Sequence, residues 1–137
     1  SILLLSWIQK KVAKLKYPRT PSGYYAAHFD MKQDRVFTAI ENMKKRVRKN
    51  GAKYIVALLP DFPDAPIDDE YPFPEHKKTL QYLSDSRIPH IDLLAGMKSN
   101  GVTNLSTVAL DGWHPDPNGH SIIARILIDA LYDHLRQ

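Results

Sequence analysis

Apolar side chains recur every three or four residues in three stretches of the chain, a spacing typical of amphipathic helices. The first stretch covers residues 2–16. The second begins after Asp30, which with Gln33 resembles a capping box, and stops at Asn50-Gly51, a typical helix end. Residues 17–29 contain two prolines and a glycine and therefore predict a loop between these two helices.

The third helical stretch lies at the C-terminus. It is expected to begin after Asp116, with Pro117 in its first turn. Its apolar face should pack against a sheet, and this face comprises Ile122, Ile123, Ile126, Leu127, Leu131 and Leu135.

Two short apolar runs have the composition of buried strands. Residues 54–59 are continuously apolar, partly β-branched, and end at Pro60. Residues 88–93 predict a second strand, residues 75–86 predict a helix between the two, and residues 107–110 predict a weak third strand. Strand, helix and strand in succession favour neighbouring parallel strands.

These elements predict an α/β fold with three layers around a parallel sheet. Strands that are apolar on both faces need parallel neighbours, and so few strands make a very small sheet. We therefore expect residues 1–137 to form one domain, the C-terminal part of a larger α/β domain whose first strands come from elsewhere. The stretch from Pro60 to Pro74 holds five prolines and five acidic residues, which predicts a functional or mobile loop.

Composition narrows the possible functions. With 137 residues, 43% of them hydrophobic, the chain has the size of one globular domain. It has no cysteine, which excludes disulfides, thiolate zinc sites and a cysteine nucleophile. No apolar run approaches the ~20 residues of a membrane span, so no membrane partner is expected.

The net charge of +4 comes mainly from two clusters of basic residues. Both clusters lie late in predicted helices, where cations complement the helix dipole on a solvated face. No nucleic-acid-binding motif accompanies them, so we expect no nucleic-acid partner. The clusters are Lys10, Lys11, Lys14 and Lys16, and Lys44, Lys45, Arg46, Arg48 and Lys49.

Candidate chemistry is concentrated in the sequence DGWHPDPNGH, residues 111–120. Asp111 and His114 are three residues apart, so in a turn the carboxylate can reach the imidazole. The pair is either an exposed polar turn or the acid and general base of a catalytic triad. Asp116 is interpreted as the cap of the last helix. Trp113 is either part of a substrate site or a packing anchor.

The other histidines give weaker indications of a functional site. His120, one turn into the last helix, is interpreted as a packing or capping residue. His28 and His76 have no evident partner in the sequence and are expected at the surface. The spacing of the histidines and acids in residues 111–120 fits no zinc pattern, so no metal or other cofactor is expected.

The block Asp111-x-x-His114-Pro115, followed by Asn118-Gly119-His120 and an apolar helix, resembles the last block of the SGNH (GDSL) hydrolase superfamily. The upstream order of helices and strands is similar to that family's C-terminal half. The resemblance implies a flavodoxin-like, three-layer fold and serine esterase activity on acyl, carbohydrate or lipid esters. It implies that His114 is the general base and Asp111 its orienting acid.

The resemblance is incomplete, because the chain contains no GDS-type block with a nucleophilic serine. The family's oxyanion-hole glycine and the asparagine of its GxND-type block are absent too. We therefore expect the 137 residues to be inactive alone, with an N-terminal segment or a second chain supplying the serine. The alternative is a non-catalytic α/β binding or interaction module.

Overall fold

The computed structural model describes residues 21–62, 67 and 74–136. The helix expected over residues 2–16 lies outside this range. The chain divides into two compact units: Ser1–Ala52 with Phe73–Glu75, and Lys53–Pro72 with His76–Gln137. Each unit is described by itself.

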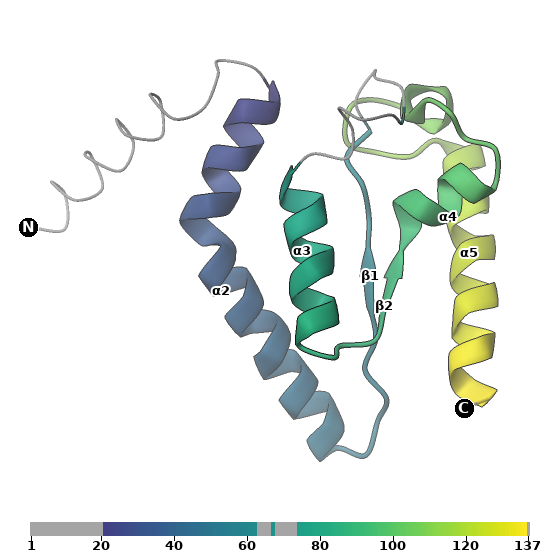
Figure 1. Cartoon of the computed structure of the whole chain (residues 1–137). Coiled ribbons are helices and arrows are strands. Elements are labelled where there is room, and N and C mark those ends of the chain that lie inside the picture. The colour runs from purple at the N-terminus through teal and green to yellow at the C-terminus, as the bar shows by residue number, and fades with distance from the viewer. Residues whose placement is uncertain (1–20, 63–66, 68–73, 137) are drawn as a thin grey trace, which may run out of the picture. The chain divides into compact units, whose positions relative to one another are not determined.

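The described part of the first unit contains a long helix, α2, which spans Pro21–Lys49 (Figure 1). The expected loop was wrong for residues 21–29, and so was the helix start at Asp30, because α2 begins at Pro21. Proline is compatible with the first helical turn, where its missing N–H needs no partner. The helix end at Asn50-Gly51 is confirmed: Gly51 has φ +72°, and the amide of Ala52 donates to the carbonyl of Val47.

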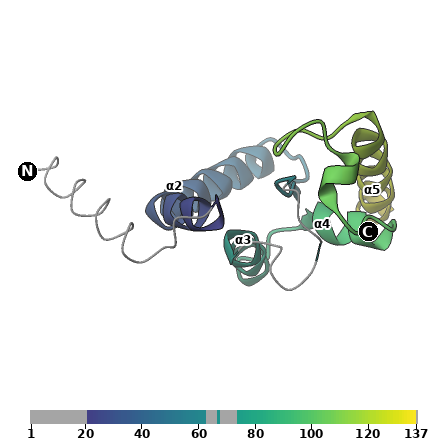
Figure 2. The same ribbon diagram turned by 90° about the horizontal axis from the view of Figure 1, so that it is seen from above.

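The second unit is built on a parallel pair of strands, β1 (Val56–Leu58) and β2 (His90–Asp92). Val56 pairs with His90 and Leu58 with Asp92, so the predicted parallel neighbours are confirmed, although each strand is shorter than expected. The predicted helix between them is α3, Pro74–Asp85. It lies on one side of the strand pair, and α4 (Leu93–Ser99) and α5 (Pro117–Arg136) lie on the other (Figures 1 and 2). The described residues therefore form a mixed α/β structure.

Side-chain caps create two short helices that sequence periodicity missed. Asp92 ends β2, and its carboxylate accepts the amide of Leu94 at 3.0 Å, which starts α4. Asn104 accepts the amide of Ser106 at 3.0 Å and starts the 3₁₀ helix η1, Leu105–Val108. The third strand predicted over residues 107–110 was therefore wrong, because the Asn104 cap favours a helical turn instead.

Helices α3 and α4 end in the same way and place their next residues in the core. After α3, Arg87 has φ +49°, and the amide of Ile88 donates to the carbonyl of Leu83 at 2.8 Å. After α4, Gly101 has φ +83°, and the amide of Val102 donates to the carbonyl of Met97 at 3.1 Å. These are Schellman motifs, and all four residues of the two bonded pairs are buried. The tightest core side chains are Phe62, Leu83, Ile88, Met97 and Leu105.

Helix α5 begins where the sequence predicted. Asp116 accepts the amide of Gly119 at 2.7 Å through its side chain, which confirms it as the N-cap. Instead of lying mainly on the sheet, as expected, α5 packs chiefly on α4 and η1. A Cβ atom at Gly96 would lie 2.7 Å from Ile126, so the α4 backbone approaches α5 closely. Ile122 is buried in this contact region, whereas Leu131 is exposed.

Gly119 makes a mutational test of this close packing possible. A Cβ atom at this position would overlap the carbonyl oxygen of Val108 and lie 2.9 Å from Pro115. Gly119→Ala should therefore lower the free energy of unfolding by about 1–3 kcal/mol, measured by urea denaturation. Gly112→Ala is the matched control, since nothing lies within 4 Å of its Cβ position. Equal stability of the two variants would contradict the close approach of α5 to η1.

Candidate active site

The DGWHP sequence forms a closed loop at the carboxyl ends of the strands. In Figure 1 both strands run upward, and the loop preceding α5 lies at that end. The two arms of the loop pair as a short antiparallel bridge between Ala109 and Pro115. The amide of Asp116 donates to the carbonyl of Val108 and that of Leu110 to the carbonyl of His114, each at 2.9 Å. These bonds fix the arms and leave only residues 111–113 at the tip.

A third backbone bond ties the loop tip to the segment after β1. The amide of Phe62 donates to the carbonyl of Gly112 at 3.1 Å. The Phe62 side chain is buried, so its amide position is set by the core. The loop is therefore positioned by the same edge of the sheet at which ligands of open α/β folds bind.

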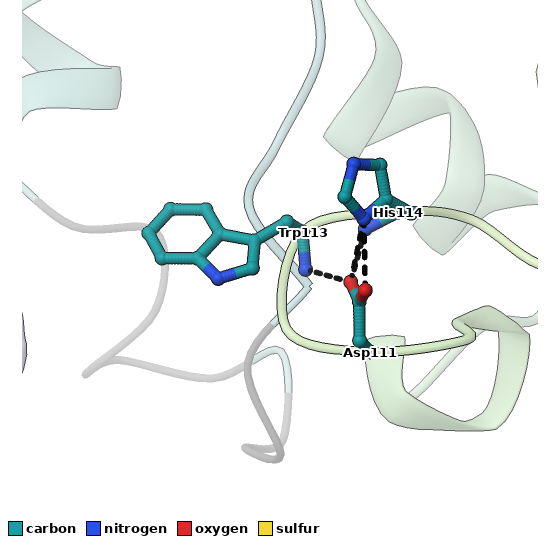
Figure 3. A network of polar contacts seen from close by, with 3 residues as sticks. All are labelled: Asp111, Trp113 and His114. Atoms are coloured by element: carbon teal, nitrogen blue, oxygen red, sulfur yellow. Dashed lines mark hydrogen bonds and ion pairs between the residues drawn. The ribbon is translucent and has the colours of Figure 1, made fainter.

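The carboxylate of Asp111 organises the loop tip (Figure 3). Its Oδ1 accepts the amides of Trp113 at 2.7 Å and His114 at 2.8 Å. The ring nitrogen Nδ1 of His114 lies 2.8 Å from Oδ2 and 3.0 Å from Oδ1. The predicted contact between Asp111 and His114 is therefore present, and the same carboxylate shapes the backbone as an Asx turn.

This contact selects one tautomer of His114. An ionised carboxylate only accepts hydrogen bonds, so neutral His114 carries its proton on Nδ1 and a lone pair on Nε2. Among the residues that the structure describes, none forms a hydrogen bond with Nε2. An imidazole held in this tautomer is suited to accept a proton at Nε2, as a general base does. The catalytic roles of His114 and Asp111 stay predictions.

The environment of the pair is open to solvent. The side chain of His114 is 70% exposed and that of Asp111 is 51% exposed. The hydrogen bond with His114, followed by the amides of Trp113 and His114, lowers the pKa of Asp111 below its ordinary value. Asp111 is therefore the ionised partner of the pair at neutral pH.

Neighbouring motif residues have structural roles or exposed positions. Trp113 is 53% exposed, which is unlike a buried packing anchor. His120 is exposed, and its amide donates to the carbonyl of Asp116 at 2.9 Å. The side chain of His28 lies outside the described residues.

Sequence analysis missed a second polar cluster, formed by Asp61, His76 and Asp92. His76, expected at the surface, is only 8% exposed, so that expectation was wrong. Its Nε2 lies 3.1 Å from Oδ1 of Asp92, the same oxygen that caps α4. His76 comes from the first turn of α3, so this contact joins α3 to the end of β2 and the start of α4.

The cluster shifts the ionisation of both carboxyl groups. Burial raises the pKa of Asp61, and the positive charge of protonated His76 opposes this effect only in part. Burial also raises the pKa of Asp92, but the His76 hydrogen bond and charge and the amides of Ala95 and Leu94 outweigh it, so the net pKa is lowered. One signal of this cluster was available, because Asp61 and Asp92 each follow an apolar run predicted to be a strand.

Three serines of the C-terminal half donate their hydroxyl protons to groups other than His114. Ser99 donates to the carbonyl of Ala95, Ser106 to Oδ1 of Asn104, and Ser121 to the carbonyl of Pro117. These bonds are local to helices and caps. Within the described part of the chain, no serine is hydrogen-bonded to His114.

Three further findings concern metal binding, membrane insertion and similarity to known proteins. Among the described residues, no three acidic or histidine side chains converge in a way that could hold a metal ion. No described helix is long and apolar enough to cross a membrane. Comparison with protein-family models, curated proteins and solved structures found no match to this chain.

The lowered pKa of Asp92 predicts a specific acid sensitivity. A carboxyl group with a depressed folded-state pKa contributes stability above its unfolded pKa, about 3.9, and loses it as pH falls through the folded value. The free energy of unfolding should therefore begin to fall near pH ~4 as Asp92 becomes protonated. Urea denaturation between pH 7 and 2 measures this loss, and His76→Ala should make it smaller.

The control for this experiment concerns Asp61. Its pKa is raised, so its contribution to the free energy of unfolding depends on pH in the opposite direction to that of Asp92. Its contribution is present below its unfolded pKa and is lost as pH rises through the folded value. Both proteins should therefore be compared in an Asp61→Asn background. An acid-induced loss of the same size with and without His76 would contradict the proposed coupling of Asp92 to His76.

The Asp111–His114 contact can be tested by carboxyl carbon NMR. The titration midpoint of Asp111 should lie below the ordinary aspartate value of about 3.9. Because His114 is the largest cause of the shift, His114→Ala should move the midpoint upward. A midpoint that is ordinary in the parent chain, or that does not respond to His114→Ala, would show that the contact does not persist in solution.

Proposed function

We propose that this chain supplies the general base, His114, and its orienting acid, Asp111, of a serine ester hydrolase of the SGNH (GDSL) type. The observation that carries the proposal is the contact of 2.8 Å between Nδ1 of His114 and Oδ2 of Asp111, with Nε2 directed away from the carboxylate (Figure 3). The substrate class is a small-molecule acyl ester or an ester of a carbohydrate or lipid.

The chemistry assigned to each residue follows from its protonation. Nε2 of His114 accepts the proton of a serine hydroxyl as that oxygen attacks the ester carbonyl, and then returns the proton to the leaving alcohol. Asp111 holds the imidazole in the required tautomer and stabilises the imidazolium that forms. The three hydrogen-bonded contacts of its carboxylate support this role, because they restrict the carboxylate to one orientation.

The other His–Asp pair is less suited to this reaction. His76 is buried, and its Nε2 contacts Asp92, whose carboxylate already caps α4. A base must reach the proton that it abstracts, which a buried ring engaged at Nε2 cannot do without leaving its partner. We therefore place the base at His114 and interpret His76 as a structural tie.

We further propose that the nucleophilic serine reaches this site on a separate segment, from the same polypeptide or from a second chain. Two observations support this. Among the described residues β1 pairs only with β2, while Ala57 in β1 and Leu59 just after it are exposed. A further parallel strand beside β1 would pair with its open backbone edge, place side chains next to Ala57 and Leu59 on the same face, and end at the edge where His114 lies. It would also extend the strand pair toward the complete three-layer fold.

Activity should depend on that supplied segment. Hydrolysis requires a nucleophile about 2.6–3.2 Å from the base, and an exposed base in water also lacks preorganised oxyanion donors. The 137-residue chain should therefore not hydrolyse a chromogenic acetyl ester at an enzymatic rate. An assembly that includes a GDS-type serine segment should be active, and His114→Ala should lower its rate by about 10²–10⁴-fold.

His120→Ala is the matched control, because it removes an exposed imidazole one turn into α5 without touching the Asp111 contact. Turnover by the 137-residue chain that survives His114→Ala would refute the base assignment. Turnover by that chain that requires His114 would refute the supplied serine instead. Absence of His114-dependent turnover in the complete assembly would favour a non-catalytic α/β binding module.

A further inference from the structure

The sequence contains three Asn-Gly pairs, at residues 50–51, 100–101 and 118–119. An asparagine followed by glycine is chemically reactive, because the glycine carries no side chain to hinder attack by its amide nitrogen on the asparagine carboxamide. The three pairs consist of the same two residues but lie in different local structures. Their hydrogen bonds and burial therefore decide which pair reacts.

The carboxamide of Asn50 is exposed at the end of α2. In the part of the chain that the structure describes, this carboxamide forms no hydrogen bond. Gly51 follows with φ +72°, nothing lies within 4 Å of its Cβ position, and its amide donates to the carbonyl of Arg48 at 3.0 Å. The Asn50 side chain can therefore turn toward the Gly51 amide without losing a hydrogen bond of its own.

The second pair has a similar backbone but a restrained side chain. The amide of Gly101 donates to the carbonyl of Lys98 at 3.0 Å, so the attacking nitrogen is engaged as in the first pair. The carboxamide of Asn100, however, donates through Nδ2 to the carbonyl of Gly96 at 2.9 Å. This bond holds the side chain against α4 and must break before the reaction, which should slow it by about three- to tenfold.

The third pair is restrained by the helix in which it lies. Asn118 is in the first turn of α5, which begins at Pro117. The amide of Gly119 donates to the carboxylate of Asp116 at 2.7 Å, and Gly119 is buried against the carbonyl of Val108. A hydrogen bond to a charged group is stronger than one to a carbonyl. Because this bond and the first turn must open together, the reaction should be about 10–100-fold slower than in an unrestrained pair.

We propose that Asn50 is a site of spontaneous deamidation, at which water converts the asparagine to aspartate and isoaspartate. The amide nitrogen of Gly51 attacks Cγ of Asn50. The bond from Cγ to Nδ2 breaks, and Nδ2 leaves as ammonia with the proton of the attacking amide. Water then adds to either carbonyl carbon of the resulting cyclic imide. Opening at one carbonyl gives aspartate, and opening at the other gives isoaspartate, in which the main chain runs through the side chain.

The modification changes the end of α2. Either product carries a carboxylate, which the C-terminal end of a helix dipole disfavours but the basic side chains of the last turn attract. Isoaspartate also lengthens the main chain, so the hydrogen bond from the amide of Ala52 to the carbonyl of Val47 loses its register. Because the chain passes from the first unit to the second between Ala52 and Lys53, the modification lies beside the junction of the two units.

The test follows all three pairs in one sample of the folded 137-residue chain, incubated in buffer at neutral pH. Digestion before aspartate places the pairs in separate peptides, and mass spectrometry measures the replacement of the amide nitrogen by oxygen. Asn50 should react about three- to tenfold faster than Asn100 and about 10–100-fold faster than Asn118. A rate at Asn50 that does not exceed both of the others would overturn the proposal.

Incubation in guanidinium chloride separates the effect of the fold from that of the sequence. In the unfolded chain the restraints on Asn100 and Asn118 are lost, so the three rates should become similar. A preference for Asn50 of unchanged size in the denaturant would refute the structural basis of the proposal.

Two matched variants identify the attacking nitrogen. Gly51→Ala should slow the reaction at Asn50, because a Cβ atom hinders the neighbouring amide. Gly101→Ala is the control, since Gly101 also has a positive φ and nothing within 4 Å of its Cβ position. It should leave the rate at Asn50 unchanged. Thermal melts followed by circular dichroism verify that both variants fold. Equal rates at Asn50 in the two variants would contradict attack by the Gly51 amide.

Discussion

The rest of the candidate site depends on the hydrogen bonds that the carboxylate of Asp111 accepts. This carboxylate accepts two consecutive backbone amides and the Nδ1 proton of His114, all within three residues. The hydrogen bonds from the two amides define the backbone turn, and this turn places the imidazole against the carboxylate. Because one charged group satisfies all of these donors, the same interaction defines the backbone path, the tautomer of His114 and the direction of Nε2.

That turn is useful only because the fold holds its two ends. Phe62 ties the tip to the end of β1, and the Asp116 cap starts α5 where the backbone of Gly119 lies against Val108. Each attachment involves a buried side chain or a position at which a larger residue would overlap its neighbours. The loop is therefore positioned by the core, although its own polar side chains face solvent. Loops that present polar side chains to solvent from a rigid core are common in α/β proteins.

The two His–Asp pairs show how burial changes the role of one chemical motif. His76 is buried and Asp92 is partly buried, and their contact joins α3, β2 and α4. Loss of Asp92 would leave the buried imidazole without this hydrogen-bond partner. His114 and Asp111 are exposed, so their contact contributes little to stability but leaves Nε2 accessible. Two His–Asp contacts, of 3.1 and 2.8 Å, thus lie in opposite environments: one joins elements of the fold, and the other leaves Nε2 of its histidine open to solvent.

Local patterns in the sequence determined the elements whose signals are local: the strand pair, α3, the end of α2 at Asn50-Gly51, the Asp116 cap and the reach of Asp111 to His114. Only the tertiary structure decided what depends on distant residues. Burial of His76 against Asp92 spans 16 positions, and the approach of α5 to α4 and η1 requires the whole second unit to assemble. Periodicity also misplaced the start of α2 and predicted a third strand where η1 lies, because neither a proline tolerated in the first helical turn nor the Asn104 cap leaves a repeat of apolar residues. A pattern of apolar residues reports which face is buried, whereas the partner that buries it is chosen by packing in three dimensions.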